Sequence, residues 1–355
     1  MCKNHRNPIQ CILPPYITDK MKDSDSFKLE DALDNELRNY RFRSDRKFFS
    51  AMPARALEMF AIKKITTVKP KAVIEIYDAG QGNSLPGKKM TKTAIAEDSD
   101  AQNVNSGAQY TWDFYYNILK RNSIDDGGMV LVNSVHYGSK YNNAMWNGRQ
   151  MIYGNGDGSV FGSFTLDIDI IGHELTHGIT QYSANLDYEN QPGALNESFS
   201  DIFGILIKQY ALNQDVNQSN WLIGENVMLG NTYALRSMIA PGTAFINHPI
   251  WGNDPQPATM DGFLTLPNTK DGDWGGVHFN SGIPNFAFCT AAREAGGYAW
   301  DTVGKVWYAA LTESLNNKSN FVDAKNATIF HAEEMFGTGS KVHNAVINGW
   351  AAAKV

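Results

Sequence analysis

The sequence predicts an α+β protein in which a strand-rich part is followed by a helical part. Up to about residue 165, short alternating segments end at Gly/Asn turns, and one amphipathic helix around 108–120 interrupts them. After residue 166 the apolar residues recur at helical spacing, and the first helix there joins the two parts. The expected strands span 71–79, 129–137 and 149–158, and the expected helices span 167–181, 194–212, 282–295, 300–314, 321–335 and 340–353.

Composition excludes several classes of protein. With 43% hydrophobic and 19% charged residues, the 355-residue chain can bury a sizeable core and is not globally disordered. A net charge of -6 argues against nucleic acid as a partner. No apolar run approaches the roughly 18 residues of a membrane-spanning helix, so we expect no membrane partner. Three widely spaced cysteines, Cys2, Cys11 and Cys289, form no disulfide framework, and nothing suggests more than a monomer.

The first 50 residues are unusually rich in charge, since ten are Lys or Arg and eight are Asp or Glu. This composition fits either a solvated extension or a propeptide that is removed near residues 49–51. No apolar stretch of about 7–15 residues follows the basic residues, so no secretory signal peptide is visible. We therefore expect synthesis in the cytoplasm, followed by retention there or by export through a non-classical route.

His173-Glu174-Leu175-Thr176-His177 lies in the helix that joins the two parts. Residues i and i+4 share a helix face, so the two imidazole rings can bind one metal ion. Glu174 is displaced by about 100° around the helix axis, which directs its carboxylate to a metal-bound water rather than to the metal. Two surface histidines on an ordinary helix would give the same letters, so the motif alone is only moderately specific.

A catalytic zinc ion needs a third protein ligand and an open fourth position. The candidate is Glu197, in a predicted helix that begins after a Pro192-Gly193 turn. Asp201 lies one turn further on the same face and can accept a hydrogen bond from a ligating histidine. A pair of acids on a helix is usually solvated, but the apolar residues 202–207 indicate a buried helix. Buried carboxylates need a partner, and a metal ion is one.

In these motifs the chain resembles the thermolysin-like zinc metallopeptidases, and the resemblance covers most of residues 70–355. The family's His-Glu-x-x-His and Asn-Glu-x-x-x-Asp motifs are both present, with 19 residues between His177 and Glu197. Related aminopeptidases also carry a Gly-x-Met-Glu-Asn motif, which this sequence lacks. The other matching segments are Asn143-Ala144-Met145-Trp146, Tyr188, Ala234-Leu235-Arg236-Ser237-Met238 and Asp273-Trp274-Gly275-Gly276-Val277-His278.

The resemblance implies a thermolysin-like fold, with a β-rich and a helical domain on either side of a zinc cleft. The propeptide would then span 1–50, the β-rich domain, which ends in the zinc-binding helix, 51–185, and the helical domain 186–355. One zinc ion would lower the pKa of its bound water toward roughly 7. The resemblance also implies an apolar specificity pocket, although phenylalanine, isoleucine and leucine more often belong to a hydrophobic core.

The same resemblance implies a role for each matched residue. The zinc ligands are His173, His177 and Glu197, with Asp201 behind them; the general base is Glu174; the oxyanion is stabilised by Tyr188 and His278, with Asp273 orienting His278. The substrate is contacted by Asn143, Ala144, Trp146 and Arg236, and the pocket for the residue after the scissile bond is lined by Phe161, Phe164, Ile170 and Leu235.

Leu13-Pro14-Pro15-Tyr16, in a short extension, resembles the protealysin subgroup of this family. The resemblance implies a compact propeptide that acts as an intramolecular inhibitor. Cys11 lies just before these residues, and its thiolate could occupy the open position on zinc. The alternative is that Cys11 is a small buried hydrophobe, which is the commoner state of a cysteine.

One departure from thermolysin concerns its paired calcium site. Asp169 and Glu225 match two acids of that site, but Lys208 stands at a third. Calcium requires about 6–8 oxygen ligands, which a lysine cannot supply. We therefore expect no paired calcium site, and an ion pair of Lys208 with Asp169 and Glu225 in its place.

These residues favour a zinc endopeptidase, made as a zymogen, that cleaves proteins or peptides on the amino side of large hydrophobic residues. Two alternatives remain open. A catalytically silent, metal-stabilised binding protein of the same fold would need neither Glu174 nor an open metal position. An exopeptidase would need a group that recognises a free amine, and the sequence identifies none.

Overall fold

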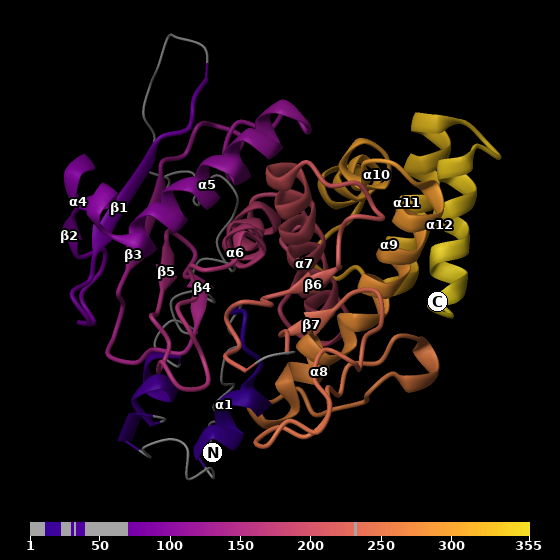
Figure 1. The fold of residues 1–355 in the computed structure, drawn as a ribbon. Coiled ribbons are helices and arrows are strands. Elements are labelled where there is room, and N and C mark those ends of the chain that lie inside the picture. Colours follow the sequence, from indigo (N-terminus) through magenta and orange to yellow (C-terminus); the bar gives the residue numbers. More distant parts are fainter. Residues whose placement is uncertain (1–10, 23–29, 32, 40–69, 231–232) are drawn as a thin grey trace, which may run out of the picture.

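The structure, a computed structural model, describes residues 11–22, 30–31, 33–39, 70–230 and 233–355. A lobe built on a sheet and a helical lobe lie side by side, with helices α6 and α7 between them (Figure 1). The N-terminal segment, which includes helix α1 (Pro15–Lys22), lies at one end of the boundary between the lobes. The predicted α+β architecture, with a strand-rich part before a helical part, is confirmed.

Five strands form a mixed sheet in the order β2-β1-β3-β5-β4. The three inner strands are parallel: β1 (Ile74–Asp78), β3 (Leu131–Val135) and β5 (Met151–Tyr153), and each lies within a predicted segment. The edge strands β2 (Lys88–Lys89) and β4 (Ala144–Trp146) are antiparallel to their neighbours and too short to give an alternating pattern. The outer edge of β4 offers backbone groups to which a further extended chain can bind.

Helices α4 (Lys92–Glu97) and α5 (Ser99–Asn117) lie between β2 and β3 in the chain and belong to the sheet lobe. Helix α4 is not predicted, and α5 begins nine residues before the predicted start at 108. Asp98 separates them, because its side chain accepts a hydrogen bond from the Ala101 N–H and caps α5. The buried residues at the start of α5 are the small Ala101, Val104 and Gly107 among polar ones, so their helical spacing gives a weak signal and the pattern places the start too late.

Helices α6 (Ile168–Gln181) and α7 (Asn190–Leu212) pack against each other at the boundary of the lobes. The prediction of a turn at Pro192-Gly193 is wrong, because α7 begins at Asn190 and both residues lie in its first turn, where proline is tolerated. Gly204 permits the close packing, since a Cβ there would lie 2.5 Å from the Asp169 carbonyl oxygen. This contact brings the His-Glu-x-x-His helix against the helix that carries Glu197.

The helical lobe contains the remaining elements. All of its predicted helices are present, and the last part of the one predicted at 300–314 is a π-helical turn at 310–314. Helix α8 is the addition that the sequence pattern does not predict. The elements are β6 (Leu222–Ile223), β7 (Arg236–Ser237), the 3-10 turns Met260–Gly262, Lys270–Gly272 and Ala299–Asp301, and the helices α8 (Asp273–Asn280), α9 (Gly282–Ala295), α10 (Val303–Ala309), α11 (Phe321–Phe336) and α12 (Lys341–Ala352).

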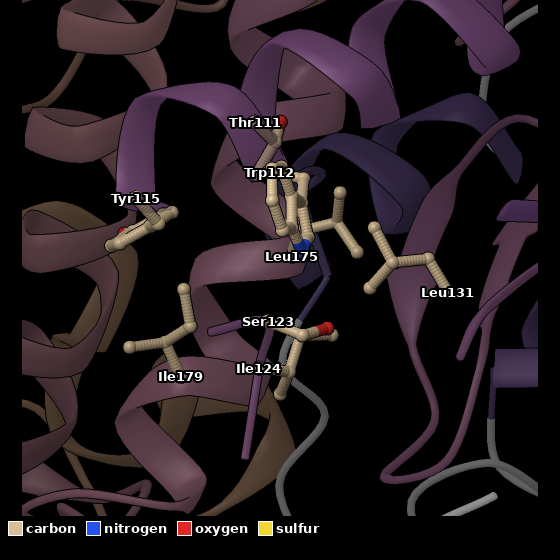
Figure 2. Close-up of a pocket in the computed structure, with 8 residues that line it drawn as sticks. All are labelled: Thr111, Trp112, Tyr115, Ser123, Ile124, Leu131, Leu175 and Ile179. Carbon is tan, nitrogen blue, oxygen red and sulfur yellow. The ribbon is translucent and has the colours of Figure 1, made fainter. Parts of the chain in front are cut away.

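A small cavity in the core lies among residues of α5, β3 and α6 (Figure 2). Its volume of about 10 Å³ is about that of one water-sized sphere. The hydroxyls of Thr111 and Ser123 already donate to the carbonyls of Gly107 and Met129, so a water there would meet an apolar wall. The cavity is therefore a packing defect rather than a ligand site. None of the described helices combines the length and hydrophobicity that crossing a membrane requires.

Candidate active site

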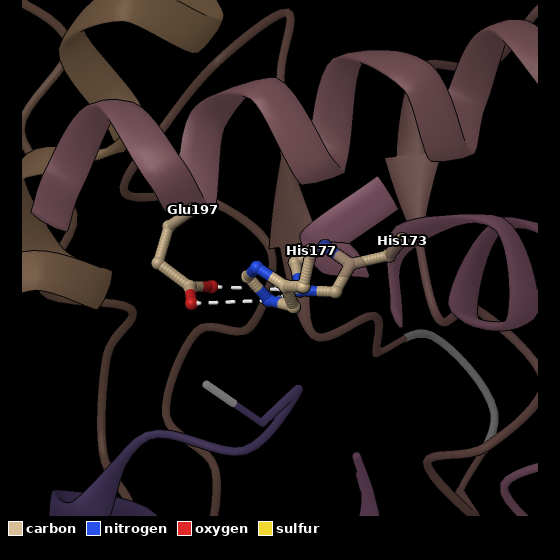
Figure 3. A group of neighbouring side chains, drawn as sticks. All are labelled: His173, His177 and Glu197. Carbon is tan, nitrogen blue, oxygen red and sulfur yellow. Dashed lines mark hydrogen bonds and ion pairs between the residues drawn. The ribbon is translucent and has the colours of Figure 1, made fainter. Parts of the chain in front are cut away.

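His173 and His177 on α6 and Glu197 on α7 point toward one another (Figure 3). The Nε2 atoms of the two histidines are 3.0 Å apart, and they lie 3.5 and 3.4 Å from the carboxylate oxygens of Glu197. Ligand atoms about 2.0–2.2 Å from a tetrahedral zinc ion are separated by about 3.3–3.6 Å. The distances from Glu197 to both histidines fall in this range, and the two Nε2 atoms lie slightly closer together than a bound zinc ion would hold them.

The hydrogen bonds around these side chains also fit a metal ion. His173 Nδ1 is 2.8 Å from Asp201 Oδ1, and His177 Nδ1 is 2.9 Å from Asn196 Oδ1. Because these oxygens accept, each ring carries its proton on Nδ1 and leaves the Nε2 lone pair for a metal. Within the described part of the chain, Glu197 Oε2 is buried and makes no hydrogen bond. A zinc ion would supply the missing partner.

Asp201 is the buried centre of the network behind the ligands. Besides His173, it accepts two hydrogen bonds from the Arg236 guanidinium, at 2.8 and 2.7 Å, and one from Asn285 Nδ2 at 2.9 Å. Burial alone would raise the pKa of Asp201, but Arg236 and His173 hold it well below its usual range. The sequence anticipates the contact with a ligating histidine, but it gives no sign of Asn285.

Glu174 is held by the backbone of the edge strand. Its Oε2 accepts the Trp146 N–H at 2.8 Å. The Trp146 indole donates to Gln181 at 3.0 Å and is almost fully buried, so the residue reaches the site through its backbone. The substrate contact of Trp146 stays a prediction. Nothing in the sequence pattern indicates the backbone contact with Glu174.

Helix α8 brings His278 to the metal-type group, which consists of His173, His177 and Glu197. Asp273, Trp274, Gly275 and Gly276 have φ between 49° and 85°, a left-handed run that the two glycines adopt without strain. This run folds Asp273 back onto His278, whose Nδ1 lies 2.6 Å from Asp273 Oδ1. Burial lowers the pKa of His278, but Asp273 and Glu197 raise it to about 9.

Tyr188 completes the group of side chains. Its hydroxyl donates to Glu197 Oε1 and lies 3.0 Å from His278 Nε2. The four side chains predicted to do the chemistry, Glu174, Tyr188, Asp273 and His278, therefore gather around the three predicted ligands.

The N-terminal segment lies in this site as an added strand. Cys11 pairs antiparallel with Met145 at the outer edge of β4. The Ile12 N–H donates to the Ala144 carbonyl at 3.4 Å, and the Leu13 N–H donates to Asn143 Oδ1 at 3.3 Å. Two residues predicted to hold a substrate backbone thus hold the chain's own backbone.

The helical lobe contacts the carbonyl groups of the same segment. Arg236 Nη1 donates to the Ile12 carbonyl at 2.9 Å, and His278 Nε2 lies 3.0 Å from the Cys11 carbonyl oxygen. The Cys11 thiol instead donates to the Leu13 carbonyl at 3.2 Å and packs with Tyr137, Tyr141, Met145 and Ile152. The suggestion that the thiol occupies the metal position is wrong for this structure, in which the Cys11 carbonyl faces His278.

The predicted specificity pocket is part of a continuous apolar cluster. Phe161, Phe164, Ile170 and Leu235 are all buried and belong to the same cluster as Ile12. The Phe161 ring lies 5.3 Å from that of Trp251, whose indole donates to the Ile17 carbonyl. The apolar surroundings are as expected, and the role of these residues in specificity stays a prediction.

Lys208 makes both ion pairs that the sequence predicts. Its Nζ lies 2.9 Å from Asp169 Oδ2 and 2.5 Å from Glu225 Oε1. Burial lowers the pKa of Lys208, but the two carboxylates raise it above its usual value. The ammonium group thus lies between the two acids, and the absence of a paired calcium site stays a prediction.

A second group, Asp98, Asp100 and His136, also has metal-type side chains close together. His136 Nε2 is 2.8 Å from Asp98 Oδ2, and Asp100 is bonded to Asn155, Ser163 and Thr165. Burial opposes the charged ring, yet its carboxylate and amide partners raise the pKa of His136. The imidazole ring therefore occupies the space between the acids, with its Nε2 facing Asp98 and its Nδ1 facing Asn155.

The site combines two buried histidines, a carboxylate and a candidate base, and an extended segment of the chain lies beside them. This is the arrangement of a metallopeptidase. Family models described as thermolysin metallopeptidase, catalytic domain, and thermolysin metallopeptidase, alpha-helical domain, match residues 42–181 and 184–355. The chain belongs to the thermolysin metallopeptidase family, which is zinc-dependent, and it is a metalloprotease.

Three individual proteins support this conclusion. The chain is 42% identical to protease PrtS from Photorhabdus sp. (strain Az29), over 78% of this chain and 74% of that protein. It is 44% identical to an extracellular metalloprotease from Pectobacterium carotovorum subsp. carotovorum, over 74% and 75%. The solved precursor of protealysin, a metalloproteinase from Serratia proteamaculans, is 38% identical, with a TM-score of 0.81 over 98% of this chain and 99% of that chain.

Proposed function

We propose that this chain is the precursor of a zinc endopeptidase that cleaves internal peptide bonds on the amino side of large hydrophobic residues. The observation that supports the proposal is the way in which Ile12 is bound. Its backbone bonds to Ala144 and Arg236, and its side chain is fully buried in the main apolar core, to which Phe161 and Leu235 also belong. A substrate residue bound in the same place would need a large apolar side chain.

Residues 1–50 would act as the propeptide, and 51–185 and 186–355 as the two catalytic domains. Residues 11–13 occupy the backbone contacts that a substrate would use, so the segment competes directly with any substrate. The proposed removal near residues 49–51 lies outside the described residues. Release of a mature enzyme from the cell, as in the relative named as extracellular, is part of the same proposal.

Each residue of the site has a task in this proposal. Zinc, held by His173, His177 and Glu197, would polarise the scissile carbonyl and acidify a water molecule. Glu174, fixed by the Trp146 N–H, accepts the proton of the attacking water and passes it to the leaving nitrogen. His278 donates to the oxygen on which negative charge develops, with Asp273 holding its ring, and Tyr188 lies beside it as a second donor.

The test compares the parent chain with Glu174→Ala, using zinc content and the cleavage of an internally quenched peptide with Leu or Phe at its centre. We expect about one zinc ion per chain in both proteins. Cleavage should occur before the apolar residue in the parent only. Zinc in both proteins with cleavage in neither, even after loss of residues 1–50, would favour a silent binding protein, and release of single terminal residues would favour an exopeptidase.

A further inference from the structure

We propose that the protease hydrolyses the Cys11–Ile12 bond of its own N-terminal segment, because the site holds this bond in the register of a scissile bond. The inference rests on the proposed endopeptidase function and adds a defined substrate sequence and a step in activation to it.

The contacts on the two sides of the bond define this register. On the carbonyl side, the Cys11 oxygen lies 3.0 Å from His278 Nε2, the donor proposed to stabilise the oxyanion. On the amine side, the Ile12 N–H faces the Ala144 carbonyl, and the Ile12 carbonyl accepts from Arg236. The groups that would hold both halves of a substrate therefore hold both halves of this one peptide bond.

The sequence of the segment opposes a shift by one residue. In the structure the Leu13 N–H donates to Asn143 Oδ1. If Leu13 moved to the position of Ile12, Pro14 would face Asn143 instead, and proline has no N–H to donate. Pro15 then begins helix α1, which is docked on the helical lobe through Tyr16 stacked on Phe279 at 4.8 Å. A shift that brings Ile12–Leu13 to the reacting position would therefore lose the contact with Asn143.

The chemical step is the hydrolysis of an amide. Water adds to the Cys11 carbonyl carbon as Glu174 takes its proton, and the C–N bond then breaks as Glu174 returns the proton to the Ile12 nitrogen. The products are a carboxylate on Cys11 and an amine on Ile12. Residues 1–11 are freed from the rest of the chain, whereas α1 keeps its contacts with the helical lobe.

The experiment follows the full zinc-loaded chain with time by intact mass and by N-terminal sequencing. We expect loss of residues 1–11 and a new N-terminus at Ile12, with a rate constant that does not depend on protein concentration, because the bond is already in the site. Glu174→Gln should slow this cleavage by at least about 100-fold. Ile12→Pro removes the N–H that faces Ala144 and should abolish it, whereas Ile12→Val keeps the N–H and the apolar side chain and should be cut within about tenfold of the parent rate.

A quenched peptide added to the same preparations distinguishes failure of the self-cleavage from failure of the proposed endopeptidase function. A chain that cleaves the added peptide while Cys11–Ile12 stays intact overturns this inference and leaves the endopeptidase function standing. Cleavage between residues 11 and 12 that persists in Ile12→Pro or Glu174→Gln also overturns it, since another protease would then be responsible. If neither bond is cut, even when Ile17→Ala loosens α1, the proposed function itself fails.

Discussion

Asp201 connects the group of His173, His177 and Glu197 to the N-terminal segment that lies beside it. It accepts from His173, which is a proposed ligand, and from Arg236, which also donates to the Ile12 carbonyl. With its charge, Asp201 fixes the proton of His173 on Nδ1 and holds Arg236 in place for a backbone carbonyl. One buried carboxylate therefore supports both zinc binding and recognition of the peptide backbone.

The substitution Asp201→Asn should weaken zinc binding by about 10–100-fold, because the neutral amide no longer favours the Nδ1–H form of His173. Competition with a graded series of chelators measures this affinity. Ser200→Ala is the matched control on the same helix. Ser200 Oγ lies 2.9 Å from His177 Nδ1, but Asn196 Oδ1 is an equally close partner, so the loss should be smaller. Equal affinity of Asp201→Asn and the parent would contradict this role.

At the level of the elements, the sequence predicts most of what depends on regular periodicity. The zinc-binding helix and the helices of the C-terminal lobe follow from apolar spacing, and the strands β1, β3 and β5 follow from alternation. Helix α8 does not, because it starts with a left-handed run from Asp273 to Gly276 that carries no periodic signal. The three-residue strand β4 is likewise too short for its pattern to be recognised.

The site residues also divide into those that regular spacing predicts and those that it does not. His173 and His177 are one helical turn apart, and so are Glu197 and Asp201, so spacing alone places each pair on one helix face. The packing of α6 on α7 then brings the two pairs together. The contact of Glu174 with the Trp146 backbone and that of Asn285 with Asp201 join distant segments. Only the packing of whole elements creates such contacts, and no local pattern in the sequence indicates them.

The ion pairs of Lys208 join α6, α7 and the segment that carries Glu225. Lys208→Met should leave the buried Asp169 without its cation and lower the free energy of unfolding by about 3–5 kcal/mol. Lys305→Met is the control, because its pair with Asp301 is exposed and should be worth less than about 1 kcal/mol. Thermal unfolding in a Glu174→Ala background, which prevents self-digestion, measures both effects.

Calcium provides a second measurement of the same element. Millimolar calcium should leave the unfolding temperature of the parent unchanged, because the Lys208 ammonium already lies between the acids. In Lys208→Met the two freed carboxylates can bind the ion, so calcium should restore part of the lost stability. A rise in the unfolding temperature of the parent with calcium would show that the lysine does not replace the ion.

At the scale of the whole molecule, the N-terminal segment contacts both lobes. Residues 12 and 13 bond to Ala144 and Asn143 of the sheet lobe, and α1 docks on the helical lobe. Ile17 is almost fully buried there, and its carbonyl accepts the Trp251 indole N–H at 3.3 Å. Lys20 of the same helix is exposed and contributes a single hydrogen bond to the Trp251 carbonyl. Asp19 adds an ion pair with Lys270 at 3.1 Å, so α1 docks through its apolar face together with this pair.

Ile17→Ala should weaken this docking by about 2–4 kcal/mol through lost burial and the cavity left behind. If the segment blocks the cleft as a tethered inhibitor, the open fraction rises by the corresponding factor, on the order of 30–800-fold. The initial rate at which the intact precursor cleaves a quenched peptide should rise in the same direction, before any processing is visible by mass. Lys20→Ala keeps the apolar face and should stay within about tenfold of the parent, since one exposed hydrogen bond is worth about 0.5–1.5 kcal/mol. Equal initial rates for Ile17→Ala and the parent would mean that α1 does not control access to the cleft, and that residues 11–13 bind there without its help.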